Sequence, residues 1–223
     1  MSKKPILKLL FIFIIGIITI LLIQNSYLSY NFYNNIFRLS QEQVQGSLIV
    51  TTRQCEKVKD CKLQPGDILI RRYITDRTRL IDRLFHPYFT HSAFYLGDGL
   101  LVEAVGTEKN REDDIQISEL SKSDWLNPDV YNFVIIRPKN YSSKLDIIKY
   151  NLLQIANDSD YFFGIPTQGE KKATCADLIY NQLSDQYIIN ASNTANVITP
   201  DYLFFTLTSD SNNFEVIGFN IQK

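Results

Sequence analysis

The chain has 223 residues, of which 45% are hydrophobic and 21% are charged, and these values exclude a disordered or fibrous protein. Its formal net charge is −1, from 23 lysines and arginines against 24 aspartates and glutamates. This balance lacks the basic excess with which nucleic-acid-binding proteins neutralise phosphates, so we expect one folded domain and no nucleic-acid partner.

The N-terminal segment, residues 1–24, carries a membrane signal. Several lysines precede residues 9–23, a run without charge. At ~1.5 Å per residue, residues 5–23 would span roughly 28 Å, close to a hydrocarbon core of ~30 Å if Lys8 snorkels. No pair of small residues marks a cleavage site after the run, so we favour a retained anchor over the alternative of a cleaved signal peptide. Lysines before the span predict a single pass with the following domain on the extracytoplasmic side.

The remaining chain divides into a tether and a folded domain. Residues 25–47 are rich in Asn, Ser, Tyr and Gln and have weak periodicity, which is typical of a tether, and the domain is predicted at 48–223. A loop and helix region is expected at 75–88. Alternation and turn residues predict strands, and apolar spacing predicts helices. The strands are expected at 68–70, 90–96, 100–105, 130–137 and 214–221, and the helices at 143–156 and 174–183.

The three cysteines predict one disulfide and one free thiol. In an oxidising compartment an even set pairs, and an odd cysteine is left over. Cys55 and Cys61 enclose a short polar loop that a disulfide can close, whereas Cys175 lies far downstream at the start of a predicted helix. The alternative for the first two is a pair of unbonded surface thiols, because their spacing suits zinc poorly.

The predicted helix at 174–183 begins with a capping pattern. Thr174 and Asp177 have the spacing of a capping box, which puts Cys175 in the first turn. There the helix dipole and the free N–H groups stabilise a thiolate and lower its pKa from ~8.5. The same N–H groups can bind the oxyanion of an acyl-transfer reaction. The alternative is that Cys175 is an inert small residue of the core.

A thiol nucleophile needs a general base, and the chain has two histidines. His86 precedes Pro87 in a predicted loop, whereas His91 opens a predicted strand. We therefore predict His91 as the base, although strand histidines are commonly structural. Two histidines without an HExxH-type motif supply too few ligands for metal catalysis, so neither a metal nor a cofactor is expected.

The glycine-rich hairpin after His91 predicts which acidic residue lies near the imidazole. If Gly-Asp-Gly forms a three-residue turn that pairs Leu96 with Leu100, Ala93 faces Glu103, and His91 lies diagonally across from Glu103. Glu103 would then orient the imidazole. A two-residue turn would instead put Glu103 on the opposite face of the sheet.

Six short motifs between residues 62 and 205 occur in a characteristic order: LQPGDI (63–68), THS (90–92), VEA (102–104), YFF (161–163), CADLI (175–179) and TPDYL (199–203). In this order they resemble the YiiX/YebB-like permuted branch of the NlpC superfamily of papain-fold cysteine hydrolases. The resemblance implies an α+β, circularly permuted papain-like fold, with an antiparallel sheet packed against helices. It also implies a catalytic set of Cys175, His91 and Glu103.

The expected function is that of a membrane-anchored, extracytoplasmic cysteine hydrolase. It would cleave amide bonds of cell-wall peptides or lipid amides through an acyl-enzyme. Ala176 and Asp177 stand where the resembled relatives commonly carry Ser and Glu, and Phe162 stands where they carry an acidic residue. The alternatives are a lipid acyltransferase or thioesterase of the same fold, whose usual residues around the cysteine are not matched by Thr174 and Ala176, and a non-catalytic binding module.

Overall fold

The structure is a computed structural model, and it describes a set of separate ranges of the chain. These are residues 14–20, 22–23, 55–72, 88–105, 114–126, 132–139, 142–158, 160, 162–164, 171–187 and 198–220. The predicted tether at 25–47, His86 and most of the predicted loop and helix region at 75–88 lie outside them.

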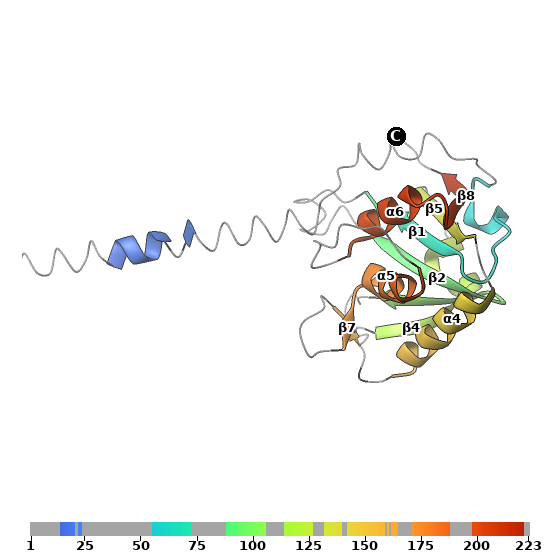
Figure 1. The fold of residues 1–223 in the computed structure, drawn as a ribbon, viewed down its shortest axis with the longest axis horizontal. Helices are drawn as coiled ribbons and strands as arrows, with labels where there is room; N and C mark the ends of the chain where they lie inside the picture. The colour runs from blue at the N-terminus through green and yellow to red at the C-terminus, as the bar shows by residue number, and fades with distance from the viewer. Residues whose placement is uncertain are drawn as a thin grey trace, which may run out of the picture.

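An antiparallel sheet forms the centre of the described part, with six strands in the order β4-β3-β2-β1-β5-β8 (Figure 1). Each neighbouring pair runs antiparallel. The strands are β1 (Ile68–Arg72), β2 (His91–Gly97), β3 (Leu100–Val105), β4 (Asp114–Glu119), β5 (Asn132–Pro138) and β8 (Phe214–Asn220). The expected α+β architecture with an antiparallel sheet is confirmed, and β4 is a strand that the sequence analysis did not predict.

Three helices pack against one face of this sheet, and Figure 1 shows α5 and α6 in front of it. They are α4 (Ser142–Ala156), α5 (Cys175–Gln186) and α6 (Pro200–Ser209). The first two match predicted helices, and α6 was not predicted. Shorter elements are the parallel pair β6 (Phe162–Phe163) and β7 (Lys172–Ala173), and the 3-10 turns η2 (Val58–Asp60), η4 (Leu120–Lys122) and η5 (Asp124–Leu126).

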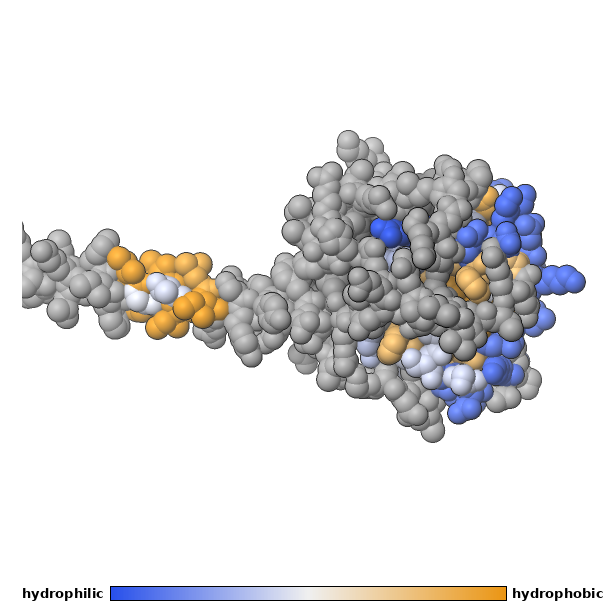
Figure 2. Space-filling view, turned by 90° about the horizontal axis from the view of Figure 1, so that it is seen from above, coloured by the Kyte–Doolittle hydropathy of each residue, from blue (hydrophilic) through white to orange (hydrophobic). Residues whose placement is uncertain are grey.

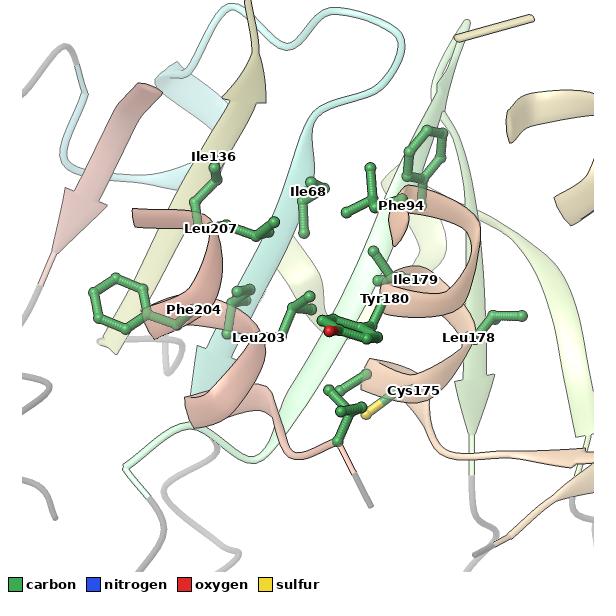
Figure 3. Close-up of a cluster of buried hydrophobic side chains, with 14 of the residues drawn as sticks. Ile68, Phe94, Ile136, Cys175, Leu178, Ile179, Tyr180, Leu203, Phe204 and Leu207 are labelled. Carbon is green, nitrogen blue, oxygen red and sulfur yellow. The ribbon is translucent and has the colours of Figure 1, made fainter. Parts of the chain in front are cut away.

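Strand alternation divides the buried side chains into two clusters. On the helix side, residues such as Ile68, Phe94 and Ile136 pack under α4, α5 and α6 (Figure 3). We call this set the helix-side cluster. The opposite face carries a smaller set, the back cluster, covered by 3-10 turns. Its members are Val58, Leu69, Ala93, Leu101, Trp125, Phe133, Ile135 and Ile217.

The hairpin between β2 and β3 has a two-residue turn. Gly97 pairs with Leu100, and the connecting residues Asp98 (φ 51°) and Gly99 (φ 77°) both have left-handed backbone conformations. Two such residues in succession are typical of the type I′ turns that suit the twist of a hairpin. The predicted three-residue turn is therefore wrong.

A bulge at Leu96 nevertheless restores the register that the three-residue turn would have produced. Phe94 pairs with Val102, and the register shifts between Tyr95 and Gly97. Extending the pairing by one residue sets Ala93 opposite Glu103. The extra residue in β2 compensates for the shorter turn, so His91 and Glu103 stay on the same face.

Cys55 and Cys61 form the predicted disulfide, with Cα atoms 5.2 Å apart. The bridge lies against β8 at the edge of the sheet. A Cβ atom built on Gly218 would collide with Cys55 Sγ and lie 2.9 Å from Cys61 Sγ, so only glycine fits beneath the two sulfurs. Asn220 also donates its side-chain amide to the Glu56 carbonyl at 2.9 Å.

Part of the predicted membrane segment is described. Residues 14–20 and 22–23 are helical with exposed apolar side chains, which Figure 2 draws in orange. Within the residues that the structure describes, no helix has the length and hydropathy needed to cross a bilayer. The transmembrane helix predicted for residues 1–24 is thus not found among the described residues.

Candidate active site

The start of α5 is fixed by a capping box. Thr174 Oγ1 accepts a hydrogen bond from the Asp177 N–H at 3.2 Å, and Asp177 Oδ2 accepts from the Thr174 N–H at 3.2 Å. Cys175 is therefore the first helical residue. Residues in the first turn of a helix have no intrahelical acceptor for their backbone N–H groups. The N–H groups of Cys175 and Ala176 are therefore available to bind an oxyanion.

Cys175 lies at the rim of the helix-side cluster. Helix α5 directs Leu178 and Ile179 into that cluster, and Figure 3 shows Cys175 at the N-terminal end of α5. The Cys175 residue is only 6% exposed, and it is the free cysteine of the chain. The α5 packing thus fixes the sulfur at one end of the sheet.

His91 joins Cys175 to Glu103. Its Nε2 lies 2.8 Å from Glu103 Oε2. Its side chain also interacts with the Cys175 thiol, and this interaction contributes to the raised pKa of His91. As the first residue of β2, His91 reaches Cys175 in the helix-side cluster and Trp125 in the back cluster. The three predicted site residues are therefore in contact.

The electrostatics of the pair favour a thiolate and an imidazolium. Burial disfavours charge on His91, but the hydrogen bonds to Cys175 and Glu103 outweigh it and raise the pKa of His91 to about 9. Burial likewise opposes ionisation of Cys175. The hydrogen bond and charge of His91, with contributions from the Ser92 side chain and backbone, still lower the pKa of the Cys175 thiol.

Glu103 is held as a carboxylate by several donors. Its Oε2 accepts from Trp125 Nε1 at 3.1 Å in addition to His91, and its Oε1 accepts from the Ser118 hydroxyl. Although burial raises the pKa of Glu103, these donors and the His91 charge lower it to about 2. Glu103 can therefore orient the imidazole and stabilise its protonated form.

Sequence reasoning missed Ser118 and Trp125. They are 15 and 22 residues from Glu103 in the chain, and β4 and η5 bring them to it. The alternation of polar and apolar residues at 114–118 could have predicted β4. Trp125 is the single tryptophan of the chain, which is the one signal that could have marked it.

Two buried aspartates connect the segments that carry these residues. Asp177 Oδ1 accepts from the Ile198 N–H at 2.9 Å, just before α6. Asp201, in the first turn of α6, accepts from the N–H groups of Tyr88 at 2.8 Å and Phe89 at 2.7 Å, just before β2. Burial raises the pKa of Asp177, and it raises that of Asp201 to about 7. The starts of α5, α6 and β2 are thus tied to one another.

The described ranges contain no group of three or more His, Cys, Asp and Glu side chains arranged to hold a metal ion. The second histidine, His86, which we did not predict to be the base, is outside those ranges. Of the predicted site residues, all three that were assigned a catalytic role, Cys175, His91 and Glu103, are described.

Comparisons with known proteins give a distant structural similarity. No protein-family profile and no curated protein sequence match the chain. Among solved structures, the chain is similar to the crystal structure of metalloprotein yiiX from Escherichia coli O157:H7, with a TM-score of 0.45 and 12% identity. The match covers 71% of this chain and 98% of that chain. We assign roles from the geometry of the site alone.

Proposed function

We propose that the protein is a cysteine hydrolase that cleaves amide bonds, with Cys175 as nucleophile, His91 as acid and base, and Glu103 as the orienting carboxylate. The observation that supports this proposal is the continuous hydrogen-bonded series from the Cys175 thiol through His91 to Glu103. A nucleophile, a base and an orienting group in this order are the requirements of acyl transfer.

In the proposed reaction, the Cys175 thiolate attacks the carbonyl carbon of the amide and forms a carbon–sulfur bond. The amides at the start of α5 stabilise the oxyanion. His91 then gives a ring proton to the leaving nitrogen as the carbon–nitrogen bond breaks, which produces a thioester and a free amine. Water attacks the thioester, His91 takes a proton from that water, and Cys175 leaves as a thiolate.

We further propose a permuted papain-like topology and a cell-wall peptide or lipid amide as substrate. The topology is supported by the chain order, in which the histidine on a strand precedes the cysteine at a helix start. The compartment is supported by the apolar N-terminal segment and by the Cys55–Cys61 disulfide, which is a typical feature of proteins outside the cytoplasm. A retained anchor would keep the domain at the outer face of the membrane.

The test is covalent labelling followed by substrate profiling. A thiol-directed probe should label wild-type protein at Cys175, and peptidoglycan fragments or acyl-amides should compete with it. Cys175→Ala should abolish both labelling and turnover, and His91→Ala should abolish turnover. Glu103→Gln should reduce the rate less, because this residue orients the base and does not react.

The outcomes separate the proposed function from its alternatives. Release of free carboxylic acid from an amide supports the hydrolase. Transfer of the acyl group to a lipid or amine acceptor without hydrolysis would identify an acyltransferase. Saturable binding of a ligand with the same affinity in wild type and Cys175→Ala, without any covalent intermediate, would contradict catalysis and indicate a binding module.

A further inference from the structure

Trp125 is a buried residue that contacts both His91, the proposed base, and Glu103, its proposed orienting carboxylate. Its indole N–H donates to Glu103 Oε2 at 3.1 Å, the same oxygen that lies 2.8 Å from His91 Nε2. Its ring lies against the His91 ring, with centroids 5.6 Å apart and planes inclined by 31°. One side chain therefore fixes the carboxylate oxygen and borders the imidazole.

The indole is itself held in place. Trp125 is 1% exposed, and the Arg71 guanidinium carbon lies 4.1 Å from the centroid of its ring. Arg71 pairs directly with His91 across β1 and β2. The turn η5 brings Trp125 to the back cluster, so the contact comes from the side of the sheet opposite the helix that carries Cys175.

We propose that Trp125 is a positioning residue that acts on His91 through Glu103. By donating to Oε2 it holds the carboxylate in line with His91 Nε2, and its ring limits rotation of the imidazole and keeps water from the hydrogen bond. This inference rests on the proposed function for its effect on catalysis, whereas its effect on the imidazole can be measured without any substrate.

The indole N–H can be removed without changing the shape of the side chain. Because the chain has a single tryptophan, replacing it with 3-benzothienylalanine exchanges the N–H for sulfur at this site alone. Trp125→Phe is a genetically simpler variant that keeps an aromatic ring. The readout is the pKa of His91, from NMR titration of the imidazole signals, with a His86→Gln variant to assign the two histidines.

Loss of the donor should weaken the His91–Glu103 hydrogen bond and move the His91 pKa from about 9 toward its ordinary value. We expect a fall of roughly one unit, because hydrogen bonds to charged groups are among the strongest in proteins. The value of kcat/KM should fall roughly tenfold, and its alkaline limit should shift with the His91 pKa.

Ile217→Ala is the matched control, because it opens a cavity in the same back cluster on a strand distant from His91. It should lower thermal stability and leave the His91 pKa unchanged. An unchanged pKa in the benzothienylalanine protein, or an equal shift in Ile217→Ala, would overturn the positioning role. A shifted His91 pKa in a protein whose wild type turns over no amide would refute the proposed function and leave the inference standing.

Discussion

The helices α5 and α6 begin with the same pattern, but only α5 carries a group that can react. Each has a threonine cap, Thr174 or Thr199, and a buried aspartate in its first turn. At the first helical position, however, α5 has Cys175 where α6 has Pro200. Proline has no N–H, so it suits a position whose N–H lacks an intrahelical acceptor, while α5 keeps that N–H beside a thiol.

The two aspartates point to a common purpose for these helix starts. In α5, Asp177 accepts from the segment before α6, and in α6, Asp201 accepts from the segment before β2. The second helix start therefore links the first to the strand that begins with His91. From this difference we infer that the start of α6 only positions the neighbouring segments. The start of α5 both positions them and carries the proposed nucleophile.

The largest expected effect comes from changing the first residue of each helix. Cys175→Ala should reduce kcat on the order of 10⁴-fold or more, since it removes the nucleophile. Pro200→Ala should change kcat less than about twofold, because alanine is tolerated at this position. Steady-state kinetics on one amide substrate measure both. A large loss of kcat in Pro200→Ala would show that the start of α6 also contributes to catalysis and contradict the division of roles between the two helices.

The pH dependence of kcat/KM tests whether α5 holds an ion pair. The thiolate forms above the lowered pKa of Cys175, and the imidazolium is lost as pH rises through about 9. We expect a bell-shaped profile with its alkaline limit near that pH. Because the folded-state pKa of His91 is raised, its contribution to stability is present below 6.5 and is lost through about 9. A profile that keeps rising above pH 9 would contradict the ion pair.

Removing the aspartates should affect stability unequally. Asp201→Ala takes the acceptor from two buried N–H groups, and we expect the free energy of unfolding to fall by about 3 kcal/mol. Asp177→Ala removes the acceptor of the Ile198 N–H and disrupts the capping box, so we expect the free energy of unfolding to fall by about 2 kcal/mol. Urea unfolding with unchanged m-values measures both losses. Equal stability of Asp201→Ala and wild type would refute the link to β2.

The smallest expected effect is the loss of the second cap. Thr199 accepts one hydrogen bond from the Tyr202 N–H at 3.2 Å, so Thr199→Ala should cost about 1 kcal/mol. The single hydroxyl hydrogen of Thr174 also has two acceptors within reach, Asp177 Oδ2 at 2.6 Å and the Ile198 carbonyl at 3.2 Å. Thr174→Ala should therefore cost more, about 2 kcal/mol, by thermal or urea unfolding. A reversed order of the two losses would contradict these contacts.

Local patterns predicted the parts of the site that depend on short-range geometry. The capping box around Cys175 follows from Thr174 and Asp177, which are three residues apart, and the cysteine pairing follows from the short loop between Cys55 and Cys61. The contact between His91 and Glu103 was predicted through a turn that does not form. The bulge at Leu96 corrects that error, and nothing in the hairpin sequence specifies it without its packing.

The rest depends on contacts between distant segments. Ser118 and Trp125 reach Glu103 because β4 adds to the edge of the sheet and the chain then turns beneath it. Asp201 lies in the first turn of α6, and its bonds to Tyr88 and Phe89 join residues 113 and 112 positions away. The Thr-Pro start of α6 could have predicted that helix, because proline is favoured at the first helical position.

The disulfide has a consequence for how the sequence can vary. Gly218 is confined by the sulfurs of Cys55 and Cys61, so a side chain at this position and an intact bridge exclude each other. In homologous chains we expect the three positions to change together. A relative without the two cysteines would be free to carry a β-branched residue at 218, the kind that an edge strand otherwise favours.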